Sequence, residues 1–539
     1  MSLRTTLSAL GLLTLVGCDA GADPIGGATN TGGAGNNGGS TSNFGGGNDQ
    51  GGGSSLGGDP KTCEEAAQYK TYLGCDFYPT VMANNVWSVF DFAAVVANGQ
   101  AEAATVTVTG NGTNQTVTVP ANGLATVYLP WVPALKGPDA DACGSATPLT
   151  ATVRATGAFH LVSSIPVTVY QFSALEYAPV GGPPGKNWAS CPASQCFLFP
   201  NECFSYSNDA SLLLPSTAQT GNFRIFGYPG WSAANIGSTI GVTGLENGTT
   251  VTVTLSATGQ IVGGADIPNV GPGGATTFSL QQGEVVELVG NATSDFSGSL
   301  IQADKPIQVI HGMPCRNIPD EYAACDHIEE SVFPAETLGK HYVVPLPTGP
   351  NGVAVSHSVR LYGNVDGTTL TYAGGTPPGA PTTLNAGQVA DLGQVTTGFE
   401  VTGSNEFAIS TFIMGAELIN PGGLAGDPAQ SVATAAEQFR LKYVFLAPTD
   451  YDSNFVDIIS PPNTTLTLDG APVNAVSEAV SPGYFVTRVP LEDVNGGTHL
   501  LTGSQPFGIQ VVGYGQYTSY MYPGGLNLDL IAPPPPPPE

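Results

Sequence analysis

The chain has 539 residues, of which 14 are Lys or Arg and 42 are Asp or Glu, so that its formal net charge is −28. It contains no basic block, and because phosphate neutralisation by Lys and Arg supplies most of the affinity for nucleic acid, we expect no nucleic-acid partner. Charged residues make up only 10% of the chain. Gly, Thr, Val, Pro and Ser dominate instead, which is typical of an exported β-rich protein and not of a helical one.

The N-terminus has the three parts of a secretory signal: Arg4 near the start, an apolar run over residues 7–16, and a small residue at the end of that run. The ending Leu-Val-Gly-Cys resembles the signal of bacterial lipoproteins, whose cysteine becomes the first mature residue and carries acyl chains. We therefore expect residues 1–18 to be the signal peptide and lipobox, with lipid attached to Cys18. The alternative is an ordinary signal peptide with a chance cysteine.

Two low-complexity segments flank the rest of the chain. Residues 19–60 are rich in Gly, Asn, Ser and Thr, and too few of them are apolar to offset the entropy of ordering, which predicts a disordered tether. Residues 531–539 hold a run of prolines, which predicts an extended tail. We expect the tether to connect a membrane anchor to a folded body.

Eight cysteines remain when Cys18 is set aside. An even number in an exported chain predicts disulfides, although sequence alone does not fix their pairing. Short loops favour the pairs Cys63–Cys75 and Cys315–Cys325. The other two bonds would then form among Cys143, Cys191, Cys196 and Cys203.

Strand signals recur between these flanking segments. Alternating Thr and Val or Leu residues, bounded by Gly, Asn, Asp or Pro, predict half-buried strands and tight turns over residues 105–109, 116–119, 250–255 and 464–468. A longer motif, an apolar pair followed by a polar turn and a second apolar segment, recurs at residues 163–169, 303–309, 403–409 and 503–509. We expect each copy of this motif to form a hairpin.

The recurring motif divides the chain into four related β units. We expect unit 1, with a Cys-rich insertion, over 61–204, unit 2 over 205–339, unit 3 over 340–441 and unit 4 over 442–530. All-β units of about 100 residues are typical of β-sandwiches, so the predicted fold is all-β with tandem sandwich-like units. The alternative is a propeller-like closed ring of sheets.

A segment across the boundary between units 2 and 3 carries a family resemblance. CDHIEESVFP at residues 325–334, followed by LGKHYVVP at 338–345, resembles the N-terminal domain of IgGFc-binding proteins, as do LLLP at 212–215 and YTSYMYPG at 517–524. The resemblance covers about 77–525. It implies a cell-surface or secreted β-rich domain and little chemistry. The family name comes from a mammalian mucus protein, so immunoglobulin binding is not carried over to this chain.

Motifs for catalysis are absent from the sequence: it has no serine-nucleophile elbow, phosphate-binding loop or zinc-binding helix. The acidic residues between 320 and 330 offer carboxylates for glycoside hydrolysis, but a solvated surface is the simpler interpretation. If Glu329 points inward, we expect it to pair with Arg316 or Lys340. Zinc binding by His311, Cys315, Cys325 and His327 is the alternative to a disulfide there.

Two further groups are candidates for binding. Oxygen ligands at alternating positions suggest calcium at Asp450, Asp452, Asn454 and Asp457, although a polar turn would explain them equally well. Large amphipathic side chains that suit an interface gather at Tyr514, Tyr517, Tyr520 and Tyr522, where core packing is the alternative. We expect no other cofactor and no catalytic residues.

These features together predict a non-enzymatic protein. It would be exported and lipid-anchored at the outer membrane or cell surface, and would bind or adhere to a protein or a glycan through its β units. The first alternative is an exported polysaccharide hydrolase. The second is a passive structural protein of the cell envelope.

Overall fold

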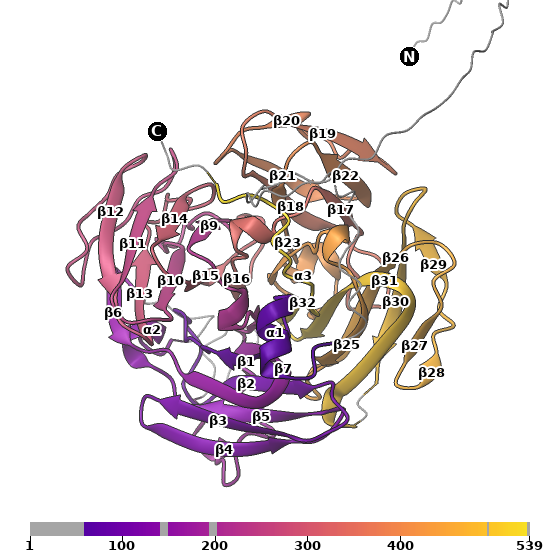
Figure 1. The fold of residues 1–539 in the computed structure, drawn as a ribbon, viewed down its shortest axis with the longest axis horizontal. Coiled ribbons are helices and arrows are strands. Elements are labelled where there is room, and N and C mark those ends of the chain that lie inside the picture. Colours follow the sequence, from indigo (N-terminus) through magenta and orange to yellow (C-terminus); the bar gives the residue numbers. More distant parts are fainter. Residues whose placement is uncertain (1–58, 141–148, 193–201, 493–494, 536–539) are drawn as a thin grey trace, which may run out of the picture. The chain divides into compact units, whose positions relative to one another are not determined.

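The computed structural model describes residues 59–535 apart from 141–148, 193–201 and 493–494. Within this part of the chain, one arrangement of eight chain segments recurs four times, each time as two antiparallel sheets packed face to face. We call these units sandwiches I to IV (Figure 1). The prediction of an all-β protein with tandem sandwich units is confirmed. Cys18 and the residues of the expected tether before Asp59 lie outside the described residues.

Sandwich I contains a sheet of β4, β3, β7 and β1 and a sheet of β5, β2, β7 and β8. Its strands are β1 (Gly74–Phe77), β2 (Phe92–Asn98), β3 (Ala104–Gly110), β4 (Thr113–Val119), β5 (Gly123–Leu129), β6 (Val153–Thr156), β7 (His160–Ser173) and β8 (Asp209–Leu213). Strand β6 leaves this sandwich and pairs with β13 of sandwich II.

Sandwich II repeats the arrangement with the order β12-β11-β14-β9 in one sheet and β16-β15-β10-β13-β6 in the other. Its own strands are β9 (Asn222–Arg224), β10 (Thr239–Gly244), β11 (Thr249–Thr254), β12 (Ala275–Leu280), β13 (Glu284–Val289), β14 (Leu300–Ala303), β15 (Ile307–Arg316) and β16 (Asp326–Ser331).

Sandwich III has the sheets β17-β22-β19-β20 and β21-β18-β23-β24. Its strands are β17 (His341–Val344), β18 (His357–Gly363), β19 (Thr368–Ala373), β20 (Thr383–Leu384), β21 (Val389–Val395), β22 (Phe399–Gly403), β23 (Phe407–Phe412) and β24 (Gln430–Val432).

Sandwich IV shares the long strand β31 between its two sheets, as sandwich I shares β7. Its strands are β25 (Arg440–Leu446), β26 (Ser453–Ser460), β27 (Leu466–Leu468), β28 (Ala471–Pro472), β29 (Ser477–Ala479), β30 (Phe485–Leu491), β31 (Thr498–Gly515) and β32 (Thr518–Pro523).

Helices are short and lie between strands. The α-helices are α1 (Cys63–Tyr69), α2 (Pro133–Lys136) and α3 (Ala416–Ile419). The 3₁₀ segments are η1 (Trp188–Ser190), η2 (Ser216–Ala218), η3 (Ala335–Thr337), η4 (Ala436–Gln438) and η5 (Asn495–Gly497). Within the described residues, no helix has both the length and the apolar character needed to cross a membrane.

The Thr/Val alternation explains the outer strands. In β3, Val106 and Val108 are buried while the threonines between and beside them face outward. Thr107 lies opposite Thr116 of β4, and their hydroxyls are 3.2 Å apart, a cross-strand pair that suits a solvent-facing sheet surface. Strand β11 repeats the pattern, with Thr252 opposite Thr277 and hydroxyls 3.1 Å apart.

The recurring motif that predicted a hairpin is instead a strand that passes from one sheet of a sandwich to the other. In β7, Leu161 pairs with Val108 in the first sheet, and Val169 pairs with Val96 in the second. The polar turn after β14 likewise leads into β15 of the opposite sheet. The hairpin prediction is wrong because the apolar segments on both sides of the turn face the same core from different sheets.

Four strands meet where the sandwiches adjoin, namely β8, β16, β24 and β32, each of which is the last strand of its sandwich. The sandwiches also contact one another in sequence: β6 pairs with β13, Arg360 of III binds Asp295 of II, and Asp457 of IV accepts the N–H of Thr348 of III at 2.8 Å. Sandwiches IV and I are in contact as well, because the hydroxyl of Tyr170 in I donates to the carbonyl of Val444 in IV at 3.1 Å. These contacts join the four sandwiches into one compact unit.

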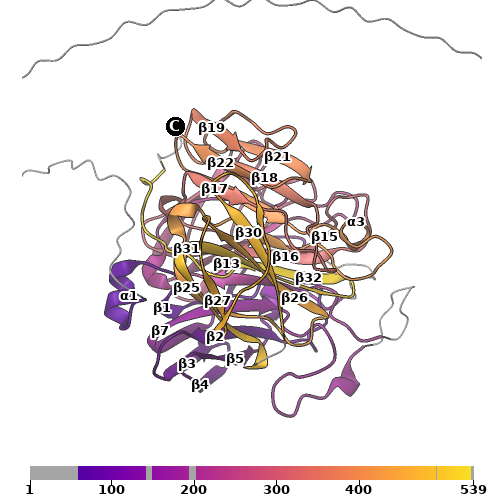
Figure 2. The same cartoon turned by 90° about the vertical axis from the view of Figure 1, so that its right-hand side faces the viewer.

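The two ends of this unit differ. At one end, near α1, Arg440 binds Asp59 and Asn527, and Leu528 donates to the carbonyl of Lys70 at 3.0 Å. The first and last described segments therefore lie together. Figure 2 shows α1 and α3 on opposite sides of the unit.

The end near α3 consists of loops, and we call it the loop face. It combines residues 177–187 of sandwich I, 228–236 and 316–325 of II, 347–356 and 413–427 of III, and 447–452 and 515–517 of IV. Gln516 donates to the hydroxyl of Tyr177 at 2.7 Å, Tyr517 to the carbonyl of Leu424 at 2.8 Å, and Gly415 to that of Ile318 at 2.9 Å. Loops from all four sandwiches thus contact one another.

Candidate functional site

The place where β8, β16, β24 and β32 meet is rich in buried carboxyl groups, and we call it the central junction. Asp209 begins β8 and joins all three other central strands. Its Oδ2 accepts the N–H of Glu329 at 3.1 Å and of Gln430 at 2.9 Å, and its Oδ1 accepts the N–H of Met521 at 3.3 Å. One side chain therefore satisfies backbone donors from sandwiches II, III and IV.

Asp326 begins β16 and has a similar role toward β8 and β32. Its carboxyl accepts the N–H of Asn208 at 2.7 Å, the hydroxyl of Thr518 at 2.8 Å and the N–H of Ser519 at 3.3 Å. Asp427, just before β24, donates its own N–H to the hydroxyl of Ser519 at 2.9 Å. Strand ends that lack partners in their own sheets are thus capped by carboxyls and hydroxyls of neighbouring sandwiches.

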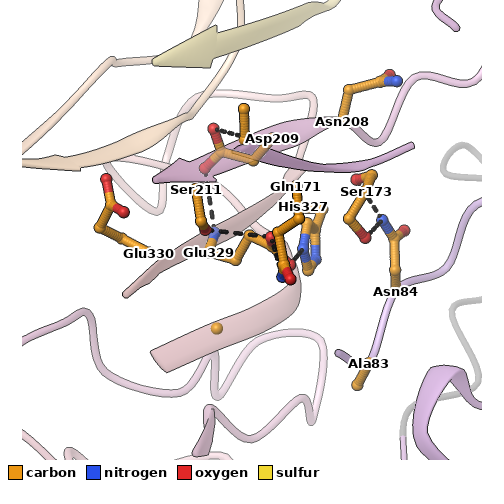
Figure 3. Close-up of polar contacts among 12 residues, drawn as sticks. Ala83, Asn84, Gln171, Ser173, Asn208, Asp209, Ser211, His327, Glu329 and Glu330 are labelled. Carbon is orange, nitrogen blue, oxygen red and sulfur yellow. Dashed lines mark hydrogen bonds and ion pairs between the residues drawn. The ribbon is translucent and has the colours of Figure 1, made fainter. Parts of the chain in front are cut away.

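Glu329 lies beside Asp209 and has side-chain partners of its own (Figure 3). Its Oε1 accepts from the amide of Gln171 at 2.9 Å and the hydroxyl of Ser211 at 3.1 Å, and its Oε2 lies 3.1 Å from Nε2 of His327. The expected pairing with Arg316 or Lys340 is wrong. Among the described residues, no Lys or Arg forms an ion pair with a carboxyl of the central junction.

Burial dominates the electrostatics of the central junction. Loss of hydration raises the pKa of Asp209, Asp326, Glu330 and Asp427 well above the usual range, although backbone N–H donors oppose the rise at the first three of these. Burial also raises the pKa of Glu287 in β13, whose carboxyl accepts the N–H of Ala83, to about 8. Burial therefore favours the neutral acid at these five carboxyl groups.

The central junction is poorly suited to catalysis. Asp209, Glu329 and His327 have no solvent exposure. Ser211 and His327 contact different oxygens of Glu329, so the imidazole does not lie between the hydroxyl and the acid as nucleophile activation requires. The expectation that the acidic residues between 320 and 330 form a solvated surface is wrong for Asp326, Glu329 and Glu330, but their burial also removes them from any polysaccharide.

The predicted short disulfides are present. Cys63 bonds to Cys75, and Cys315 bonds to Cys325, so the two cysteines of the zinc alternative are consumed. A third disulfide joins Cys191 to Cys203 within the insertion after β7. Cys143 and Cys196 lie outside the described residues.

The calcium candidates do not converge. Asp450 accepts the N–H groups of Tyr177 and Ala178 at 2.6 and 3.2 Å, whereas Asp457 is buried against Thr348. Asn454 donates to the carbonyl of Pro448 at 3.0 Å and accepts from the hydroxyl of Tyr520, while Asp452 is exposed. Within the described part of the chain, no group of three or more His, Cys, Asp or Glu side chains is placed to hold a metal.

The tyrosine candidates are mostly core residues. Tyr514, Tyr520 and Tyr522 have no exposure, and their hydroxyls bind Thr348, Asn454 and Leu446. Only Tyr517 is partly exposed, on the loop face. The prediction that these tyrosines form a solvent-facing interface is therefore wrong. Tyr520 and Tyr522 pack inward because β32 is a central strand with sandwiches on both sides, and Tyr514 packs inward from the neighbouring strand β31.

Sequence reasoning missed Asp209, Asp427 and Gln171. An aspartate at or just before the start of a central strand is the shared signal for Asp209, Asp326 and Asp427. This position is shared only when the central strands of the four sandwiches are compared in the folded structure.

A comparison with protein-family models matches residues 209–513 to the IgGFc binding protein family. The match covers more than half of the chain. The chain belongs to the IgGFc-binding protein family. The matched region begins at Asp209, the first residue of β8, and ends within β31 of sandwich IV. No curated protein and no solved structure matches the chain.

Membership of the IgGFc-binding family confirms the resemblance inferred from residues 325–345. The family is one of binding domains and is not known for catalysis. Together with the three disulfides, which persist in oxidising compartments, family membership indicates an extracellular binding protein.

Proposed function

We propose that this chain is a lipid-anchored binding protein that presents its loop face to a protein ligand. The observation that carries the proposal is the difference between the two ends of the unit. The chain enters at Asp59 beside α1, whereas loops of all four sandwiches gather at the α3 end (Figure 2). A tether that reaches the folded unit at Asp59 attaches at the end opposite the loop face and leaves the loop face free for a ligand.

The composition of the loop face suits protein binding. Val353 and Leu424 are exposed by 60% and 40%, and Val180 by 56%. Asn351 donates to the side chain of Asn420 at 3.0 Å, so two of these loops are joined. Exposed apolar side chains on loops that hydrogen bonds and disulfides hold in place lose little conformational entropy on binding. The family's name describes the binding of a protein, which makes a protein the favoured ligand class over a glycan.

The lipid anchor is tested by cell fractionation. We expect wild-type protein to partition with membranes and Cys18→Ser protein to be found in the soluble fraction. Incorporation of a labelled fatty acid into wild type but not into the variant would establish the attachment. An unlabelled wild-type protein in the soluble fraction would overturn it.

Binding is tested with the full mature chain immobilised through its N-terminus. The Fc fragment of immunoglobulin G is the first probe, because the family is named for it, and a panel of extracellular proteins follows. We expect saturable binding that Leu424→Asp together with Val353→Asp weakens at least about tenfold, since charge at an apolar contact costs more than about 1.4 kcal/mol. Leu441→Asp at the α1 end, where Leu441 is 53% exposed, is the matched control and should not weaken it.

Two outcomes would contradict the proposal. If Leu441→Asp abolished binding and the loop-face variants left it intact, the ligand would bind at the α1 end and not at the loop face. Release of new reducing ends from a polysaccharide panel by the same protein would establish the hydrolase alternative.

A further inference from the structure

Three polar side chains meet at the base of the insertion that joins β7 to β8. Lys186, within the insertion, places Nζ 2.7 Å from Oδ2 of Asp91, the residue before β2. Glu176, shortly after β7, accepts the N–H of Asp91 through Oε2 at 2.8 Å, and its carboxyl group interacts directly with that of Asp91. We call Asp91, Glu176 and Lys186 the insertion triad. An amine, a carboxyl and a second carboxyl are thus in contact within the folded chain.

We propose that Lys186 and Asp91 form an intramolecular amide bond, and that Glu176 promotes its formation. The bond would attach the insertion covalently to the start of β2. Formation of this bond does not require the ligand that the loop face binds.

The chemistry needs no partner outside the chain. A proton passes from the Lys186 ammonium to the Asp91 carboxylate, which turns the ion pair into a neutral amine and a carboxylic acid. The amine nitrogen then attacks the carboxyl carbon of Asp91, and the carboxylic acid of Glu176 donates a hydrogen bond to the oxygen on which negative charge develops. Glu176 next transfers a proton from the nitrogen to the departing hydroxyl. The C–N bond forms, the C–O bond breaks, and one water molecule leaves.

The surroundings of the insertion triad favour these steps. Burial, and then the charge of Asp91, raises the pKa of Glu176 to about 8, so that it remains an acid near neutral pH. The side chains of Lys186 and Asp91 retain only 13% and 19% of their exposure. The ring of Trp188 lies 4.7 Å from Nζ of Lys186 and packs on Phe90 at 5.3 Å. Partial exclusion of water lowers the cost of neutralising the ion pair and hinders hydrolysis of the product.

A second ion pair of the chain provides a matched control. Nζ of Lys136 lies 2.8 Å from Oδ1 of Asp139, close to the 2.7 Å between Lys186 and Asp91. The Lys136 side chain is more buried than that of Lys186, at 1% exposure, whereas Asp139 is more exposed than Asp91, at 39%. The other partner of Asp139 is Ser88, and among the described residues no second carboxyl contacts it. We expect this pair to remain an ordinary salt bridge because it lacks the equivalent of Glu176.

Peptide mass spectrometry of the full chain tests the proposal. Cleavage after aromatic residues separates Asp91-Phe92 from the peptide over 178–188, which ends at Trp188. We expect a branched product in which these two peptides are joined with the loss of one water molecule. The peptide over 132–159, which holds both Lys136 and Asp139, should be recovered without the loss of a water molecule. Wild-type protein that yields only linear peptides at both pairs would overturn the proposal.

Variants distinguish the role of Glu176 from that of the ion pair. Glu176→Gln should give linear peptides while the Cys191–Cys203 disulfide and the near-ultraviolet circular dichroism show that the fold persists. Asp91→Asn should still form the bond, now releasing ammonia, and should end at the same branched product as the wild type. A branched product in Glu176→Gln, or a loss of water within the peptide that holds Lys136 and Asp139, would overturn the role assigned to Glu176.

Discussion

The central junction and the insertion triad are both buried clusters of carboxyl groups, yet they differ in what faces the carboxyls. In the junction, Asp209 and Asp326 accept mainly backbone N–H groups and hydroxyls from other sandwiches. In the triad, Asp91 faces an amine and a second carboxyl. Carboxyl groups therefore specify how the four sandwiches meet in the central junction, whereas in the insertion triad a carboxyl group can react with an amine.

The comparison also separates global from local consequences. Besides the N–H of Ala210 in its own strand, the carboxyl of Asp209 accepts backbone N–H groups from sandwiches II, III and IV, so its loss affects the whole unit. The partners of Glu176 and Asp450 hold the segment that begins at Tyr177, which lies at the edge of sandwich I. Disturbing them should release the insertion and leave the sandwiches in place.

The largest effect is expected for Asp209→Ala. This substitution leaves the buried N–H groups of Glu329, Gln430 and Met521 without an acceptor, at about 1–3 kcal/mol each, so we expect a loss of roughly 5 kcal/mol in the free energy of unfolding. Urea denaturation followed by fluorescence measures it. Asp450→Ala is the matched variant and should cost about 2 kcal/mol or less, with faster hydrogen exchange confined to the segment after Tyr177. Equal costs for the two variants would contradict the distinction between the regions.

A second, intermediate effect is a dependence of stability on pH. Folding raises the pKa of Glu287, next to the junction, from 4.5 to about 8. Its contribution to stability is therefore fully present below pH 4.5 and is lost as the pH rises through about 8. We expect the melting temperature to fall between pH 5 and pH 9. Glu287→Gln retains an acceptor for the N–H of Ala83 and cannot ionise, so it should flatten this fall by on the order of 3 kcal/mol at pH 9.

The stability of the insertion should also fall as the pH rises, but only in protein that lacks the amide bond between Lys186 and Asp91. The pKa of Glu176 is also raised from 4.5 to about 8. In Lys186→Arg, which cannot form the amide, alkaline pH should lower the protection factors of the insertion, that is, the protection against hydrogen exchange relative to an unstructured chain at the same pH. A melting temperature that rises steadily from pH 5 to pH 9 in wild type would contradict the expectation for Glu287 and the central junction, and protection factors in the insertion of Lys186→Arg that do not fall at alkaline pH would contradict the expectation for the triad.

The smallest effect is expected for Tyr177→Phe. The hydroxyl of Tyr177 accepts the N–H of Gln516 on the loop face at 2.7 Å, and its loss should cost about 1 kcal/mol. Thermal unfolding measures the change, and hydrogen exchange should locate it at residues 515–517. An effect as large as that of Asp209→Ala would show that the loop face and the central junction unfold as one unit.

Local features of the sequence were reliable guides to local structure. The Thr/Val runs at 105–109 and 250–255 are strands β3 and β11, and the close spacing of Cys315 and Cys325 correctly suggested their disulfide. The hairpin expected at 163–169 failed because a polar turn between apolar segments is equally compatible with a strand that changes sheets. Choosing between them depends on which distant strands pair with Leu161 and Val169.

The sequence by itself determined the all-β class, the fourfold repetition of the strand motif and the family, and it favoured two of the disulfides, because each depends on the spacing of residues close together along the chain. Only the tertiary structure decided that Asp326 and Glu329 are buried, that Tyr520 and Tyr522 face inward, and that Lys186 meets Asp91 and Glu176. The physical reason is that burial and pairing of these groups depend on segments that lie far away in the sequence. A carboxylate pattern that suits a solvated loop is the same pattern that, once four strands surround it, caps their backbone groups.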